Sequence, residues 1–429
     1  MMINRKNIPP VHPINNIDIP KPEIIKLKNG ISLYIINVGE EDVVRLDILI
    51  GGGQWSQTKK LQSMFTNRML REGCIGHTSA EIAEKLDYYG AWLDLSSSVN
   101  YNFVTLYSLN KYFDRTLDVI SGIVMNPTFP EKEFATVVDN NRHQFLVNSE
   151  RVEMMSRKKL YESLFGLSHP LGKYAYIEDY DIITCDDLKD FYRTNYHSGN
   201  VTIFISGKVT EDIINRIEAR FGSQEWGEVK PSSNFIDVTP ITTDEKHIFV
   251  HKEGALQSSL RMGGFFLDRT DPEFLKSRVL VTLFGGYFGS RLMSNIREDK
   301  GYTYGIGAGI VSYPYRGVLS ISTEAANEFI PSIIKEVYSE MDRLCNDMVS
   351  DKELNMVKSY MIGDMCRSYE GPFSISDAWI YTYVSSLPDD FHEKSLEAIK
   401  SVTKEEILYL AQKQFSKQNL IEVVAGEKM

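Results

Sequence analysis

The chain has few cysteines, and their spacing excludes two common kinds of covalent or metal framework. Four occur among 429 residues, at Cys74, Cys185, Cys345 and Cys366, and no two of them form a CxxC pair. Disulfide scaffolds and cysteine-built zinc sites both need closely grouped cysteines. We therefore expect four free thiols and a reducing compartment, the cytoplasm.

Long apolar runs and an excess of basic charge are also absent. No stretch reaches the roughly 18 apolar residues that a spanning helix needs, and prolines and asparagines break up residues 1–20, which are expected to form an extended arm. The 47 basic residues are outnumbered by 58 acidic ones, which gives a net charge of -11. A surface of this sign repels phosphate backbones and anionic lipid head groups. Neither nucleic acid nor a membrane is an expected partner.

Histidines are scarce, and their spacing does not favour metal binding. Of the eight, only His247 and His251 are four residues apart. Their β-rich surroundings predict a strand, in which residues i and i+4 share a face but lie about 13 Å apart. That distance is too long for a shared ion, so we expect no metal in this chain. A GxSxG nucleophile elbow is absent too, which argues against an autonomous serine hydrolase of that kind.

The sequence does contain an internal duplication. Residues 184–207 align without a gap onto residues 403–426, and each copy begins with a threonine three residues ahead of an acid. This spacing matches a capping box, in which hydroxyl and carboxylate satisfy the first free amides of a helix. Each copy then runs through an aromatic residue and a β-rich segment to a glycine. The repeat predicts an α+β fold of two homologous domains.

Each domain is expected to combine an antiparallel-rich sheet with helices. We place the first domain at residues 1–227 and the second at residues 243–429, joined by a linker in which prolines and serines gather. In the first domain, hydrophobic periodicity predicts strands at 31–36, 44–49, 93–98 and 103–108. It predicts helices at 61–70, 78–89 and 113–124 and a long helical region at 130–165. The second domain repeats this order, with a strand at 259–266, a helix at 272–283, strands at 304–312 and 317–323, and a helix at 328–345.

Several segments together resemble the pitrilysin and insulinase superfamily of zinc peptidases, which includes the mitochondrial processing peptidase. In the first half the resemblance rests on Gly52-Gly-Gln-Trp, Met69-Leu-Arg-Glu-Gly and Phe165-Gly-Leu-Ser-His-Pro-Leu-Gly. In the second half it rests on Gly285-Gly-Tyr-Phe-Gly-Ser-Arg-Leu and Ile296-Arg-Glu-Asp-Lys-Gly-Tyr-Thr-Tyr. Each segment alone is a weak signal, but their order and spacing over nearly the whole chain are specific.

Catalytic members of this superfamily carry HxxEH on a helix, where two histidines bind zinc and the glutamate polarises water. This chain has Ser63, Thr66 and Asn67 at the three matching positions. A further glutamate ligand lies about 75 to 80 residues on in the family, which corresponds to about Gln144 here, with Asn141 nearly one turn earlier. None of these side chains is an imidazole or a carboxylate. The resemblance therefore implies a member with a degenerate zinc site.

In divided members of the superfamily, one chain brings zinc and the other supplies an arginine and a tyrosine seven residues apart. This pair is present as Arg297 and Tyr304. The resemblance implies that Tyr304 stabilises an oxyanion and Arg297 holds a substrate carbonyl, and that Gly285 and Gly286 belong to a loop that admits extended peptides. The structural alternatives are an arginine salt-bridged at a helix end, a tyrosine packed at a strand start and a tight glycine turn. Tyr302 competes with Tyr304, although the spacing favours Tyr304.

These observations predict the non-catalytic subunit of a heteromeric zinc peptidase that degrades unfolded peptides. Zinc is expected in the partner, an HxxEH-bearing chain of the same family, and no cofactor is expected in this one. Extended peptides would add a strand to a sheet edge. The alternative is an inactive peptide-binding or scaffold protein, such as a homodimer, as in the core subunits of the respiratory cytochrome complex that share this fold.

Overall fold

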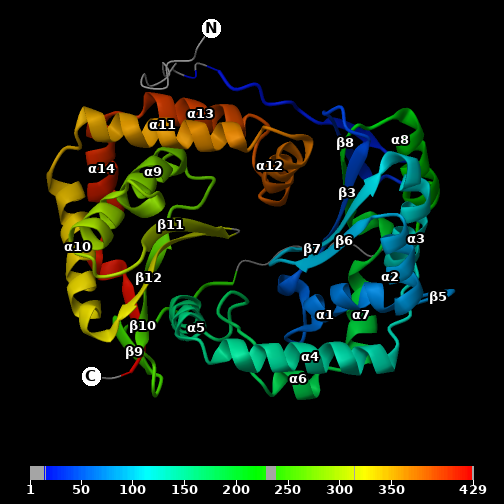
Figure 1. Cartoon of the computed structure of the whole chain (residues 1–429), viewed down its shortest axis with the longest axis horizontal. Coiled ribbons are helices and arrows are strands. Elements are labelled where there is room, and N and C mark those ends of the chain that lie inside the picture. The colour runs from blue at the N-terminus through cyan, green and yellow to red at the C-terminus, as the bar shows by residue number, and fades with distance from the viewer. Residues whose placement is uncertain (1–13, 15, 229–237, 314, 428–429) are drawn as a thin grey trace, which may run out of the picture.

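Two sheets, each with its own helices, form the two halves of the molecule (Figure 1). The computed structural model describes residues 14, 16–228, 238–313 and 315–427. Residues 1–13 and 15 of the predicted N-terminal arm and residues 229–237 of the predicted linker lie outside the described residues. The first sheet uses strands between residues 23 and 207, and the second uses strands between residues 247 and 426.

The first sheet has six strands in the order β1-β2-β8-β3-β7-β6. Neighbouring strands are antiparallel except for β2 and β8, which run parallel. The strand bounds are β1 Glu23–Lys26, β2 Ser32–Asn37, β3 Val43–Gly51, β6 Trp92–Ser97, β7 Tyr101–Leu109 and β8 Val201–Gly207. β8 is buried throughout and β3 in its interior, because both faces of the sheet are covered. A separate ribbon pairs β4 (Gly73–Cys74) with β5 (His77–Thr78).

The second sheet has five strands in the order β11-β12-β10-β13-β9, with β13 and β9 parallel and the other pairs antiparallel. The strand bounds are β9 His247–His251, β10 Gln257–Phe266, β11 Ile306–Tyr313, β12 Arg316–Ala326 and β13 Ile421–Gly426. Its order matches β6-β7-β3-β8-β2 of the first sheet, position by position, including the one parallel pair. The predicted internal duplication and α+β class are thus confirmed.

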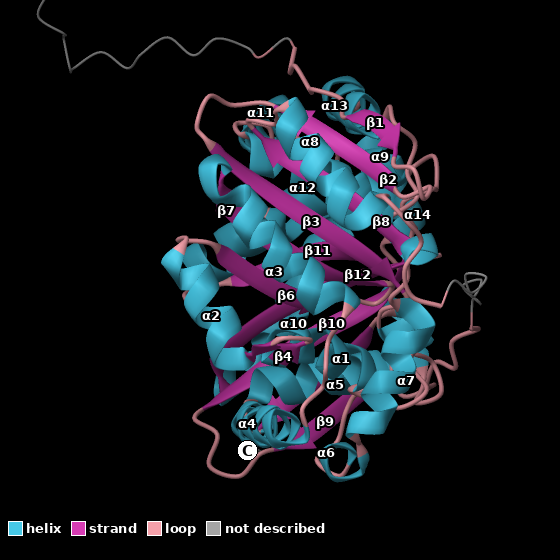
Figure 2. Ribbon diagram, turned by 90° about the vertical axis from the view of Figure 1, so that its right-hand side faces the viewer, coloured by secondary structure: helices cyan, strands magenta, loops and turns pink. Residues whose placement is uncertain are grey.

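Helices cover the outer faces of the sheets, with α2, α3 and α8 on the first sheet in the side view (Figure 2). Those of the first half are α1 Gln62–Met69, α2 Ser79–Tyr88, α3 Phe113–Met125, α4 Glu131–Ser149, α5 Val152–Phe165, α6 Asp179–Ile182, α7 Cys185–Asn195 and α8 Glu211–Ile217. Those of the second half are α9 Phe274–Val281, α10 Ile330–Asn346, α11 Asp351–Arg367, α12 Pro372–Val384, α13 Phe391–Ser401 and α14 Lys404–Gln414.

The predicted capping boxes begin the helices they were assigned to. Thr184 and Asp187 cap α7, and Thr403 and Glu406 cap α14 at the equivalent place in the second half. Thr78 caps α2 in the same way. The predicted helix at 272–283 continues past α9 as a π-helical segment, η6 (Thr282–Gly286), and the strand predicted from residue 304 begins at Ile306.

Two helices cross from one half to cover the sheet of the other. Helix α5 of the first half packs on β10 and β13, where Leu160, Leu164 and Phe165 form a buried cluster with Ile421 and Val423. Helix α12 of the second half packs on the first sheet, where Ile375 and Trp379 meet Ile36, Leu49 and Phe204. Each half therefore completes the core of the other.

Among the described residues, no helix is long and apolar enough to cross a membrane. The four cysteines are free thiols, as expected, with Cys74 and Cys185 buried.

Candidate functional site

Helix α1 presents the degenerate zinc-motif positions to the protein interior. Ser63, Thr66 and Asn67 are each 0% exposed. The hydroxyl of Ser63 donates to Asn102 Oδ1 at 2.9 Å, and the hydroxyl of Thr66 donates to the Gln62 carbonyl of its own helix at 2.7 Å. Both hydroxyls are thus hydrogen-bonded within the protein.

Asn67 fastens α1 to the sheet below it. Its Nδ2 donates to the carbonyls of Ser96 and Phe103, on β6 and β7, at 2.8 and 3.0 Å. Its Oδ1 accepts a hydrogen bond from the hydroxyl of Tyr196 at 3.0 Å. Burial raises the pKa of Tyr196 well above its ordinary value, so this hydroxyl keeps its proton. An amide whose oxygen and nitrogen are both hydrogen-bonded to the protein, with three partners in all, is a structural group.

Helix α4 places Gln144 away from this cluster. Gln144 is exposed, and its amide donates to Asn148 Oδ1 on the same helix at 3.2 Å. Asn141, one turn earlier, accepts a hydrogen bond from Arg68, the residue that follows Asn67. Of these two residues, Asn141 is therefore the one with a hydrogen bond to α1, whereas the hydrogen bond of Gln144 stays within α4.

Arg297 and Tyr304 lie side by side in the second half. Arg297 lies in the last turn of the π-helical segment η7 (Met293–Asp299), whose residue Ile296 is buried in the core. Its guanidinium carbon lies 5.3 Å from the ring centre of Tyr304 and 4.4 Å from that of Phe288, which are cation–π distances. Tyr304 is 91% exposed. With the described carboxylates Arg297 forms no ion pair, and the Tyr304 hydroxyl has no hydrogen-bond partner among the described residues.

The loop that carries Tyr304 is fixed on both sides of it. Tyr302 is half-buried and stacks on Phe329 with ring centres 5.1 Å apart, and its amide donates to the Ile296 carbonyl. The hydroxyl of Thr303 lies 2.8 Å from that of Thr323 and 2.7 Å from the Glu324 carbonyl, both on β12. Tyr302 is thus a core residue, and Tyr304 projects from a held loop into solvent.

The glycine run sits next to this pair. Gly285 is buried, and a Cβ there would lie 2.6 Å from the Cβ of Ala308, so only glycine lets η6 approach β11 this closely. Gly286 is exposed, and the loop after it brings Phe288, 60% exposed, over Arg297. Sequence reasoning missed Phe288. Its position between Gly286 and Gly289 was the available signal.

Comparison with known proteins accounts for both halves of this arrangement. The sequence profile described as "Insulinase (Peptidase family M16)" matches residues 35–172. The profile described as "Peptidase M16 inactive domain" matches residues 183–361. The chain belongs to the M16 family.

M16 relatives span nearly the whole chain. An uncharacterized zinc protease of Rickettsia felis is 24% identical over 92% of this chain and 95% of its own length. A protein of Helicobacter pylori named as a non-peptidase homolog is 22% identical over 83% of this chain and 82% of its own. The crystal structure of a peptidase M16 inactive domain from Pseudomonas fluorescens superimposes with a TM-score of 0.83 at 22% identity, covering 95% of this chain and 98% of that one.

Within the M16 family, this chain has a degenerate zinc motif. The three positions that would hold zinc carry the hydroxyl of Ser63, the amide of Asn67 and the exposed amide of Gln144, and Thr66 stands where the water-polarising glutamate would be, so the donor set does not fit the metal. Among the described residues, no three histidine, cysteine or acidic side chains are grouped as a metal would require.

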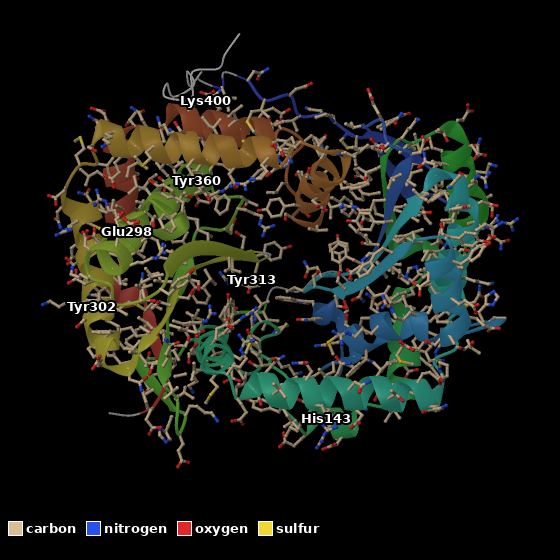
Figure 3. The ribbon with its side chains drawn as sticks, in the orientation of Figure 1. His143, Glu298, Tyr302, Tyr313, Tyr360 and Lys400 are labelled. Atoms are coloured by element: carbon tan, nitrogen blue, oxygen red, sulfur yellow. The ribbon has the colours of Figure 1, made fainter. Side chains whose placement is uncertain are left out.

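The M16 arginine and tyrosine pair is remote from the chain's own α1. Glu298 and Tyr302, which neighbour the pair in sequence, lie in the second half, across the molecule from α1 (Figures 1 and 3). The pair thus belongs to the other half of the chain from α1.

Proposed function

We propose that this chain is the non-catalytic subunit of a heteromeric M16 zinc peptidase and supplies Arg297 and Tyr304 to the active site of an HxxEH-bearing partner. The observation that carries the proposal is the state of this pair: a tyrosine that is 91% exposed, beside an arginine held between two aromatic rings and paired with no described carboxylate. Neither residue has a structural task that would explain this arrangement.

The pair has the chemistry that peptide hydrolysis requires beyond a metal. The guanidinium of Arg297 lies over the rings of Phe288 and Tyr304, and its N–H donors can hold a peptide carbonyl. The phenol of Tyr304 can donate to the oxygen on which negative charge develops during amide hydrolysis. Because the loop around Tyr304 is fixed by Tyr302 and Thr303, this donor is positioned in advance.

The activated water in this proposal belongs to the partner, whose zinc would supply it. The closed hydrogen-bond network on α1 and the distance between α1 and Arg297 both favour action between chains. The name of the Helicobacter pylori relative, a non-peptidase homolog, agrees with a chain that does not hydrolyse peptides alone.

The proposed substrates are extended or unfolded peptides in the cytoplasm. Strand β11 is an edge of the second sheet and begins two residues after Tyr304. A peptide that added a strand there would pass the phenol through main-chain hydrogen bonds, which are largely independent of sequence. The absence of disulfides between the four thiols is consistent with a reducing compartment.

The direct test is Tyr304→Phe in the complex reconstituted with the HxxEH-bearing partner. Loss of one oxyanion donor should lower kcat by about 10²-fold with unchanged assembly. Tyr302→Phe is the matched control, since it also removes one phenol from the same loop but leaves the ring stacked on Phe329, and turnover should stay near wild type. Equal kcat for Tyr304→Phe and wild type would remove the tyrosine from catalysis and favour a peptide-binding scaffold.

A further inference from the structure

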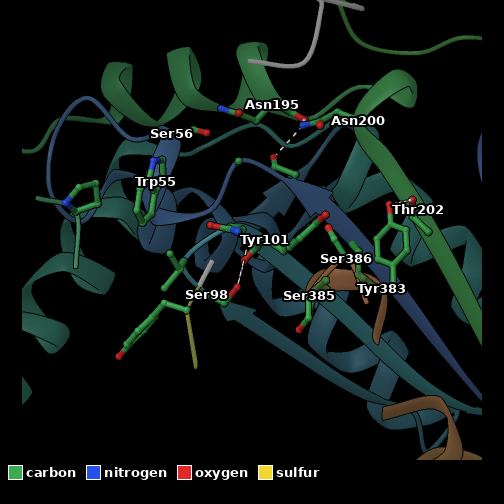
Figure 4. A pocket seen from close by; sticks show the side chains of 18 of the residues that line it. Trp55, Ser56, Ser98, Tyr101, Asn195, Asn200, Thr202, Tyr383, Ser385 and Ser386 are labelled. Atoms are coloured by element: carbon green, nitrogen blue, oxygen red, sulfur yellow. Dashed lines mark hydrogen bonds between the residues drawn. The ribbon is translucent and has the colours of Figure 1, made fainter. Parts of the chain in front are cut away.

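A cavity of about 1150 Å³ lies between the two halves, apart from both site regions described above (Figure 4). The first half contributes the loop before α1, the hairpin between β6 and β7, and the segment from the end of α7 into β8. The second half contributes the loop after β10, the end of β11 and the end of α12. Neither Arg297 nor Tyr304 is among its lining residues. Its volume is of the size that small ligands and short peptides occupy.

Aromatic side chains form much of the wall. Trp55 and Tyr313 line one part, and Tyr101 and Tyr383 line another. The hydroxyl of Tyr383 is held by Thr202 Oγ1 at 2.7 Å, so its ring is fixed against the first sheet (Figure 4). Aromatic faces fixed in this way can contact large apolar side chains at little cost in conformational entropy.

The wall of the cavity also includes an arginine that forms no ion pair with the described carboxylates. Arg269, in the loop after β10, donates to the Ser312 carbonyl at 2.7 Å and to the hydroxyl of Ser385, and its guanidinium carbon lies 5.0 Å from the ring centre of Tyr381. Its Nε is buried without a hydrogen-bond partner among the described residues, and none of the described carboxylates forms an ion pair with it. Burial lowers the pKa of Arg269, and the nearby charge of Asp268 offsets only part of this effect.

The other charged residue of the lining is Asp268. Its Oδ1 accepts hydrogen bonds from the amide and the hydroxyl of Thr270 at 2.8 and 2.5 Å, so it serves the conformation of its own loop. His197 also lines the cavity, from the segment between α7 and β8. Arg269 is thus held by two neutral groups and one ring, and a carboxylate from a ligand would supply the missing charge-assisted partner.

We propose that this cavity binds the carboxyl-terminal end of a short peptide, with the free carboxylate on Arg269 and large apolar side chains against Trp55, Tyr101, Tyr313 and Tyr383. The ligand class is an apolar peptide with a free C-terminus, which is the kind of product that endopeptidases release. This site lies within one chain, so it needs no partner subunit and goes beyond the assistance proposed for Arg297 and Tyr304.

The test compares two probes on the full-length chain alone. Acetyl-Ala-Leu-Phe with a free carboxylate and the same peptide as its C-terminal amide are titrated by calorimetry at low ionic strength. The carboxylate form should bind at least about 10-fold more tightly, because a charge-assisted hydrogen bond to a half-buried guanidinium is one of the stronger polar contacts.

Variants then assign that preference to Arg269. Arg269→Gln should bind both probes alike, while Arg291→Gln, which removes a half-buried guanidinium paired with Glu353 outside this cavity, should keep the wild-type preference. Arg269→Lys retains the charge and should keep part of the preference, which separates loss of charge from loss of fold. Peptide should also change the tryptophan fluorescence of wild type but not of Trp55→Phe.

Three outcomes would overturn the proposal. They are equal affinity of wild type for the two probes, an undiminished preference in Arg269→Gln, and no binding of either probe at millimolar concentration. None of these would bear on the effect of Tyr304→Phe in the reconstituted complex, so the two proposals fail independently.

Discussion

Asn67 shows how one residue can turn a catalytic position into a structural one. Its amide joins α1 to two strands and accepts a hydrogen bond from the buried Tyr196 hydroxyl. Replacing a metal ligand by such an amide removes the need for an ion, since the Asn67 amide oxygen and nitrogen both have protein partners. The helix is therefore held in place by hydrogen bonds of the protein itself.

Asn67→Ala should lower the free energy of unfolding by about 2–3 kcal/mol, because the buried Tyr196 hydroxyl and two carbonyls inside the protein would lose their hydrogen bonds to Asn67. Thr66→Val is the matched control, since Thr66 donates mainly to a carbonyl of its own helix, and it should cost about 1 kcal/mol or less. Urea denaturation of both variants measures the difference. Equal losses would contradict the structural role assigned to Asn67.

Protonation of His392 should make the stability of the fold depend on pH. It is buried on α13, with Nδ1 at 2.8 Å from the Tyr369 hydroxyl and Nε2 at 2.8 Å from that of Thr382. Burial lowers the pKa of His392 below its ordinary value of 6.5. As pH falls through 6.5, the unfolded chain binds this proton while the folded chain does not, so stability falls with acidification.

The expected result is a decrease in Tm between pH 7.5 and 5.5 that is smaller in His392→Gln. His143→Gln, an exposed histidine on α4, should keep the wild-type slope. A wild-type slope in His392→Gln would show that the imidazole is not the group responsible.

At the scale of elements, local signals were readable from sequence and long-range packing was not. Capping boxes such as Thr184 with Asp187 depend on four adjacent residues, so they could be predicted. The crossing of α5 and α12 between halves depends on contacts more than a hundred residues apart, such as Ser156 with Ser259 at 2.9 Å. Which of Gln144 and Asn141 makes a hydrogen bond to α1 is a matter of helix phase, which counting along a sequence does not fix.

The crossing of α5 requires a glycine in the strand beneath it. A Cβ at Gly263 on β10 would lie 2.9 Å from Leu160 Cδ2 of α5 and 3.1 Å from the Leu319 carbonyl. Gly263→Ala should therefore destabilise the protein by about 1–3 kcal/mol, the usual cost of overpacking.

Gly309 on β11 is the matched control for this substitution, because a Cβ there would meet nothing within 4 Å. Gly309→Ala should be neutral or stabilise the fold by about 0.4–1 kcal/mol, since alanine restricts the unfolded chain. Thermal unfolding of the two variants distinguishes them, and a Gly263→Ala variant as stable as Gly309→Ala would argue against close contact between α5 and β10.

At the scale of the molecule, the two halves pack firmly against each other but differ in the functional residues they carry. Arg45 of the first sheet is 3% exposed and pairs with both Asp47 and Asp377, the latter on α12 at 2.7 Å, so an ion pair as well as apolar packing holds the halves together. The first half has lost the residues of a zinc site, while the second keeps an exposed pair suited to peptide hydrolysis. A chain with this division of features would complete the active site of another chain.

The most direct test of this account measures zinc and peptide cleavage on the same samples, with the chain purified alone and co-purified with an HxxEH-bearing M16 subunit. Elemental analysis gives zinc per chain, and a quenched unfolded peptide reports hydrolysis. The account predicts a zinc-free, inactive chain alone, and zinc with turnover in the complex. Stoichiometric zinc together with cleavage by the chain alone would contradict it.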